Sequence, residues 1–220
     1  MGRDPIAGPA VARKAVLTPT DSPRRPRSGP RDATTREQIF HHAVKLFARD
    51  GYANTSLDDI ALAVGIKKPS LYHYIRTKED LLYEIQQVLA QEILDEVDAL
   101  LATASTPDEK VTAFFRAAFR LIARRQAEMT IFLNETQTLR ARSKRWREIN
   151  AKRDAYQKLF EDVLSDGMAA GAFRALPITL TALGMLGTVT WAYRWYRADG
   201  LDPDEIADLY VDIVLHGIAA

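Results

Sequence analysis

Basic and hydroxyl-bearing side chains are concentrated in one stretch of the sequence that carries no negative charge. The segment from Ile60 to Lys78 contains four lysines and arginines but no aspartate or glutamate. Lysine ammonium groups and tyrosine hydroxyls can reach the phosphates of DNA, and residues at the start of a helix can approach base edges. The pattern therefore predicts a DNA-binding surface, with an ordinary solvated helix face as the alternative. The candidate contacts are Ser56, Lys67, Lys68, Pro69, Ser70, Tyr72, His73 and Lys78.

Three short helices are predicted to position this surface. The first covers residues 34–50, where Thr34 and Glu37 have the spacing of a capping box. The second covers residues 56–64 and the third residues 67–75, with a tight glycine-containing turn between them. Two short helices joined by such a turn form a helix-turn-helix, whose second helix is placed to enter the major groove.

The composition excludes several other kinds of site. With no cysteine, the chain of 220 residues has no disulfide or thiolate metal site, and its four histidines show no zinc-binding spacing. A glycine-rich phosphate loop and a nucleophile elbow are both missing, so we expect no enzyme, no metal and no cofactor. The longest apolar stretch, residues 176–193, contains proline and glycine and falls short of a membrane span. We therefore expect a cytoplasmic protein without a membrane partner.

The first 33 residues differ in composition from the rest. They contain seven basic and three acidic residues, a net charge of +4, together with six of the ten prolines. Such a segment is predicted to be a disordered basic arm. Either it adds sequence-independent attraction to DNA phosphates, or it is an extension without a role.

Residues 83–220 are predicted to form an entirely helical second domain. Thr77 caps the helix that enters it and leaves Lys78 at a helix N-terminus, where a phosphate is favoured. Apolar residues then recur at helical spacing, with no alternation typical of strands. The expected helices cover about residues 81–101, from 107, 128–139, 146–171, 177–197 and from 203, which gives nine helices in an all-α fold.

The segments 55–61, 65–66, 71–74 and 77–82 together resemble the reading head of the TetR family of repressors. The resemblance implies a helix-turn-helix DNA-binding domain in residues 34–82, called the head below. It also implies a ligand-binding and dimerisation domain in residues 83–220, called the body. Such a protein binds a palindromic operator as a homodimer and is released by a small molecule.

The last two helices are expected to form the dimer interface, because the resemblance implies that they pair with their symmetry mates. A dimer also doubles the few base contacts of one recognition helix. Burial inside one subunit is the alternative. The interface residues are predicted to be Trp195, Ile206, Leu209, Tyr210, Ile213 and Val214.

A ligand site is predicted among the helices of the body. Arg153 lies on an otherwise apolar helix face, where its charge needs either Glu135 or an anionic ligand as a partner. Residues 190–197 and the final helix resemble the regulators of fatty-acid and steroid catabolism that respond to acyl-CoA, which implies an acyl-CoA effector. A different hydrophobic ligand, or a DNA-architecture protein without a ligand, is the alternative. The predicted ligand residues are Phe115, Phe119, Phe132, Arg153, Tyr156, Phe160, Thr188 and Trp191.

Overall fold

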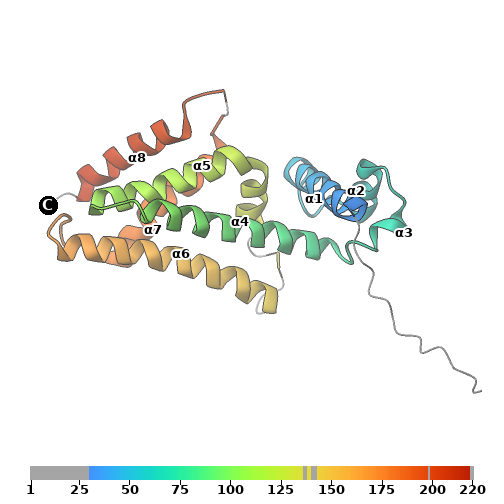
Figure 1. Ribbon diagram of the computed structural model, residues 1–220, viewed down its shortest axis with the longest axis horizontal. Coiled ribbons are helices and arrows are strands. Elements are labelled where there is room, and N and C mark those ends of the chain that lie inside the picture. The colour runs from blue at the N-terminus through green and yellow to red at the C-terminus, as the bar shows by residue number, and fades with distance from the viewer. Residues whose placement is uncertain (1–29, 136–137, 140–142, 198, 219–220) are drawn as a thin grey trace, which may run out of the picture.

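The computed structural model describes residues 30–135, 138–139, 143–197 and 199–218, and within these ranges it confirms the all-α fold (Figure 1). The described helices are eight α-helices and one 3-10 helix, η1. Their bounds are α1 Pro30–Asp50, α2 Leu57–Val64, α3 Lys68–Leu71, α4 Lys78–Leu101, α5 Pro107–Asn134, α6 Lys144–Ala169, α7 Ile178–Thr190, η1 Trp191–Arg194 and α8 Pro203–Ile218.

Local signals set the ends of the helices in the head. Ser56 and Asp59 form a capping box at the start of α2, and Gly65 ends it in the left-handed conformation at φ 77°. The predicted cap at Thr34 is wrong, because α1 begins at Pro30 and Thr34 lies inside it. The predicted arm therefore loses residues 30–33 to α1, and the rest of it lies outside the described residues.

Helix α3 is shorter than predicted. It ends at Leu71, and turns carry the chain on to Ile75, with the Tyr74 amide donating to the Leu71 carbonyl at 2.9 Å. Leu71 and Ile75 are buried beneath these turns. Their burial fixes the segment on α1 and α2 even without a long helix.

Helix α4 is shared by the head and the body. It starts with a second capping box, formed by Thr77 and Asp80, and continues for 24 residues into the body (Figure 1). Leu81, Leu82 and Ile85 belong to the buried cluster of the head, while Val97 belongs to that of the body. Helix α4 is therefore packed into the cores of both the head and the body.

Helix α5 is bent at Arg125, where φ is −132° and ψ is 36°. The side-chain amide of Gln126 donates to the carbonyls of Tyr193 and Tyr196 at 3.0 and 2.9 Å, which holds the bend against η1 and the residues after it. The two predicted helices starting at residues 107 and 128 are the two arms of this bent helix. This merger explains why eight α-helices are described instead of nine.

Charged side chains line the faces by which α5 meets α4 and α8. Arg116 pairs with Asp208, and Arg120 pairs with Asp204 at 2.6 Å and with Glu96 at 3.5 Å. The hydrogen bond from Arg120 lowers the pKa of Asp204. Each of these partly exposed pairs contributes little alone, but together they fix how α8 lies on α5.

The described residues contain no helix long and apolar enough to cross a membrane. Among the same residues, no cluster of three or more histidine or acidic side chains is arranged to hold a metal ion.

A close contact near the end of α6 gives a test of the fold. A methyl group on Gly167 would lie 2.3 Å from the buried ring of Phe173, so the substitution Gly167→Ala must displace that ring. We expect the free energy of unfolding, measured with urea, to fall by about 1–3 kcal/mol. The exposed neighbour supplies a control: Asp166→Ala should change it by less than about 0.5 kcal/mol. Equal stability of the two variants would contradict this packing.

Candidate nucleic-acid interface and ligand site

The structure places most of the predicted DNA contacts on one exposed surface of the head. The side chains of Lys67, Lys68, Pro69, Ser70, Tyr72 and His73 are all exposed. Lys68 forms an ion pair with Asp58 of α2 at 2.8 Å, with both side chains about half exposed. Such a pair is weak and can exchange for a phosphate. Tyr72 is 47% exposed, so its hydroxyl is accessible to a phosphate.

The Ser56 side chain is already committed to the start of α2. Its hydroxyl lies 2.6 Å from the Asp59 carboxylate and accepts from the Asp59 amide at 3.2 Å. Ser56 therefore fixes the orientation of α2, and its direct contact with DNA stays a prediction.

Lys78 has an unexpected place in the structure. Its ammonium donates to the carbonyls of Tyr52, Ala53 and Thr55 at 2.5, 3.3 and 2.8 Å, and it lies 4.2 Å from the centre of the Tyr52 ring. An ammonium has three donor hydrogens, and all three are used here. A phosphate contact by Lys78 would require one of these bonds to break. In the absence of DNA the lysine joins the loop after α1 to the start of α4, and its phosphate contact stays a prediction.

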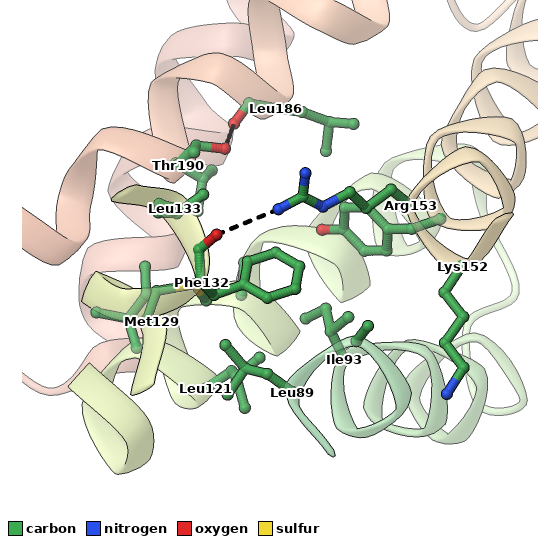
Figure 2. A pocket seen from close by; sticks show the side chains of 15 residues that line it. Leu89, Ile93, Leu121, Met129, Phe132, Leu133, Lys152, Arg153, Leu186 and Thr190 are labelled. Carbon is green, nitrogen blue, oxygen red and sulfur yellow. Dashed lines mark hydrogen bonds between the residues drawn. The ribbon is translucent and has the colours of Figure 1, made fainter. Parts of the chain in front are cut away.

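A partly open pocket of about 160 Å³, called the cavity below, lies between α4, α5, α6 and α7 (Figure 2). Its wall is almost entirely apolar, and three of the predicted ligand residues belong to it, namely Phe132, Arg153 and Tyr156. The full lining is Leu89, Ala90, Ile93, Ala118, Leu121, Ile122, Met129, Phe132, Leu133, Lys152, Arg153, Tyr156, Leu186, Val189 and Thr190.

The other five predicted ligand residues do not line the cavity. Phe115, Phe119 and Phe160 are fully buried in the core, where Phe119 packs on Tyr210 of α8. Thr188 and Trp191 are exposed on the outer side of the body, and the guanidinium of Arg194 lies 4.3 Å over the Trp191 ring. Periodicity identifies the apolar residues of a helix, but it does not show which of them face a cavity.

Sequence reasoning missed the wall that α4 contributes, formed by Leu89, Ala90 and Ile93. Their apolar character was visible, but α4 is also buried against α5 and α6, so no local signal separates its cavity face from its packing face. The cavity is consequently adjacent to the helix that carries the head.

Arg153 extends from α6 toward the end of α5 (Figure 2). Its guanidinium donates to the Phe132 carbonyl at 3.2 Å and lies 4.3 Å over the Phe132 ring. Burial lowers the pKa of Arg153. Of the two partners considered for Arg153, Glu135 forms no ion pair with it among the described residues, and the Glu135 carboxylate accepts from the Thr138 hydroxyl. The anionic ligand stays a prediction.

Tyr156 stands one helical turn after Arg153 on the same face of α6. Its ring packs on Phe114 at 5.4 Å, and burial away from bulk water raises the pKa of its hydroxyl. Among the described residues, no hydrogen bond to the hydroxyl is formed. Because Tyr156 borders the cavity, the group that satisfies this hydroxyl can come from a ligand.

The predicted dimer interface divides into two groups. Trp195, Leu209 and Ile213 are exposed, as are Leu180 and Leu183 of α7. Ile206 is only 6% exposed and packs in the core of the body, and Tyr210 and Val214 are partly buried against that core. For Ile206 the alternative of burial inside one subunit is therefore correct.

A helix-turn-helix head joined by a shared helix to a helical body with an apolar cavity defines a DNA-binding transcriptional regulator. Residues 39–85 match the family model for bacterial regulatory proteins of the tetR family, and residues 104–218 match the Tetracyclin repressor-like C-terminal domain. The chain belongs to the TetR family.

Several relatives have known roles or structures. The HTH-type transcriptional repressor KstR2 of Mycolicibacterium smegmatis is 30% identical over 90% of this chain and 94% of that protein. The ketosteroid transcriptional regulator KstR2 of Mycobacterium tuberculosis superposes with a TM-score of 0.79 at 29% identity, over 84% of this chain and 95% of the other. AibR in complex with isovaleryl coenzyme A and operator DNA gives 0.73 at 30% identity, over 81% and 97%. These relatives are regulators of transcription, which agrees with the expectation that the chain is not an enzyme.

The position of Lys78 predicts an effect on stability. Lys78→Met removes three hydrogen bonds between a charged donor and loop carbonyls, so we expect the free energy of unfolding to fall by about 1.5–3 kcal/mol in urea titrations. Lys67→Met removes an equal charge from the exposed surface and should change stability by less than about 0.5 kcal/mol. Equal stability of the two variants would show that the Lys78 contacts do not stabilise the fold.

Proposed function

We propose that the protein is a homodimeric repressor that binds a palindromic operator and leaves it when an acyl thioester occupies the cavity. We also propose that it acts in the cytoplasm. The proposal rests on the position of the cavity, because two of the helical segments that line it also pack against the head.

The first of these walls is the part of α5 beyond the bend at Arg125. Met129, Phe132 and Leu133 of this segment line the cavity, while Ile131 is buried in the core of the head. The segment contacts α1, and in Figure 1 it turns away from the rest of α5 to lie beside that helix. A ligand that displaces one face of the segment also displaces the other.

The second wall is α4, which leads directly into the head. In a dimer the two recognition helices must lie about 34 Å apart to enter successive major grooves, so a small rotation of α4 disturbs their register. A hundredfold loss of operator affinity requires a coupling free energy of about 2.7 kcal/mol. A ligand that prefers the displaced arrangement by this amount would act as an inducer.

Support for a thioester comes from the cavity and the relatives. The partly buried guanidinium of Arg153 suits a ligand that brings an oxygen acceptor or negative charge into an apolar site. AibR was crystallised with isovaleryl coenzyme A, and a relative in Bacillus subtilis is a fatty acid metabolism regulator protein, 24% identical over 74% of this chain and 86% of that protein.

The proposal is tested by operator release. The specific site is first selected from random duplexes, and its affinity is measured by fluorescence anisotropy with and without coenzyme A thioesters. We expect a palindromic site and a fall in affinity with at least one thioester. If no thioester of any chain length changes operator affinity, the proposed inducer class is excluded.

Arg153→Met should separate ligand response from DNA binding. The substitution keeps an unbranched stem beside Phe132 and removes the charge at the cavity wall. We expect unchanged operator affinity and a thioester response reduced by about tenfold, the effect of losing one charged hydrogen bond. A normal response in this variant would leave Arg153 with a structural role alone.

The dimer interface is tested with two isoleucines of α8. Ile213 is 62% exposed in the single chain, so Ile213→Glu should leave the subunit folded but place unpaired charges in the interface and give monomers in sedimentation. Ile206 is buried, and Ile206→Glu should instead destabilise the subunit itself. Leu62 on α2 is exposed but outside the proposed interface, so Leu62→Glu should remain dimeric. A dimer retained by Ile213→Glu would exclude this surface.

A further inference from the structure

We infer that the cavity selects a short acyl group of about five or six carbon atoms, whose carbonyl or carboxylate oxygen is held by Tyr156 and Arg153. This inference rests on the proposed ligand-controlled function and adds the size and polarity of the group that enters the protein.

The volume of the cavity limits the size of the acyl group that can enter it. An engineered protein cavity of about 150 Å³ lined by leucine, isoleucine and phenylalanine side chains binds benzene. The cavity described here, about 160 Å³, therefore accommodates an apolar group of similar size. A long fatty-acyl chain or a fused ring system would have to push apart helices whose side chains are packed as densely as a crystal.

The walls of the cavity have little freedom to retreat. Leu121 and Ile122 precede the bend in α5, and both are almost completely buried. On the opposite side of α5, Arg120 ties this part of the helix to Asp204 and Glu96. Leu89 and Val189 close the space from α4 and α7 and are themselves buried. On these sides of the cavity, the length of a bound chain is thus limited by core residues.

The polar end of the cavity is formed by α6. Tyr156 and Arg153 are three residues apart, and both border the cavity. The Tyr156 side chain is partly buried and borders the cavity, and no hydrogen bond of its hydroxyl is found within the described part of the chain. An acceptor atom placed beside this hydroxyl therefore lowers the free energy of the complex. A guanidinium carries five donors in a fixed plane, a geometry that suits a carbonyl or carboxylate oxygen.

Lys152 also borders the cavity, but its charged end is directed elsewhere. Its ammonium donates to the side-chain oxygen of Gln87 at 2.5 Å, and Figure 2 shows it pointing away from Arg153. Among the described lining residues, Arg153 therefore supplies the positive charge at the polar end.

The shared chemistry of the ligand is a compact apolar chain ending in an oxygen acceptor. This description fits a free short-chain carboxylate and the acyl part of a short thioester. Thermal unfolding of the full-length dimer distinguishes them, with one series of free acids and one of coenzyme A thioesters, from acetyl through pentanoyl and hexanoyl to dodecanoyl. We expect the largest rise in Tm at pentanoyl or hexanoyl in at least one series.

Separate variants test the polar end and the walls of the cavity. Tyr156→Phe removes one oxygen, and we expect it to weaken binding of the best compound about tenfold. Tyr196→Phe alters a buried tyrosine outside the cavity and should bind normally.

Met129→Ala removes three heavy atoms from the wall of the cavity and should increase the preferred chain length by about two or three carbons. If neighbouring side chains fill the space left by Met129, Ile93→Ala provides the same enlargement from α4.

The outcomes are distinct. The inference is overturned if dodecanoyl compounds stabilise the protein most, if no short compound stabilises it, or if Tyr156→Phe and Tyr196→Phe bind equally well. Operator release by long-chain thioesters would then leave the proposed function intact. Short compounds that raise Tm without changing operator affinity would support the inference and exclude the proposed induction.

Discussion

The segment of α5 beyond Arg125 is packed into two cores at once, and the arrangement of the whole molecule depends on this. Ile131 is buried with the side chains of the head, while Met129 and Leu133 pack against the core of the body. Gln126 anchors the segment to the carbonyls of Tyr193 and Tyr196. Because close-packed side chains move together, the head cannot change its angle to the body without moving a wall of the cavity.

The junction between α4 and the end of α5 also contains a polar misfit. The buried side chain of Gln86 donates its amide hydrogen to the Glu135 carbonyl at 3.1 Å, while its oxygen has no hydrogen-bond partner among the described residues. A buried acceptor without a partner raises the free energy of this arrangement. The free-energy difference between this arrangement and one in which the Gln86 oxygen is hydrogen-bonded is therefore smaller. A small difference between two conformations is what allows a ligand to shift the population from one to the other.

The head was predictable because its helices are set by local signals, whereas the cavity is defined by packing between distant elements. Ser56 and Gly65 mark the ends of α2 in the sequence itself. Phe119 and Phe132 are equivalent as apolar residues of one helix, yet the first faces α8 and the second faces the cavity, across the bend. Nor does any local pattern show that the Lys78 ammonium reaches carbonyls more than twenty residues earlier.

The sharing of buried residues between head and body has a consequence for engineering. Residues 34–82 form a recognisable domain in the sequence, but their core also includes Ile131, Leu139 and Ile149 from the body. A fragment cut at residue 82 would leave the apolar surfaces that meet these residues open to water. An experiment that exchanges the DNA-binding head between such regulators must therefore also transfer the side chains of the body that pack against it. The other option is to substitute only the exposed residues around α3. The part that must be exchanged is a set of residues that pack together, and these residues do not form one continuous segment of the chain.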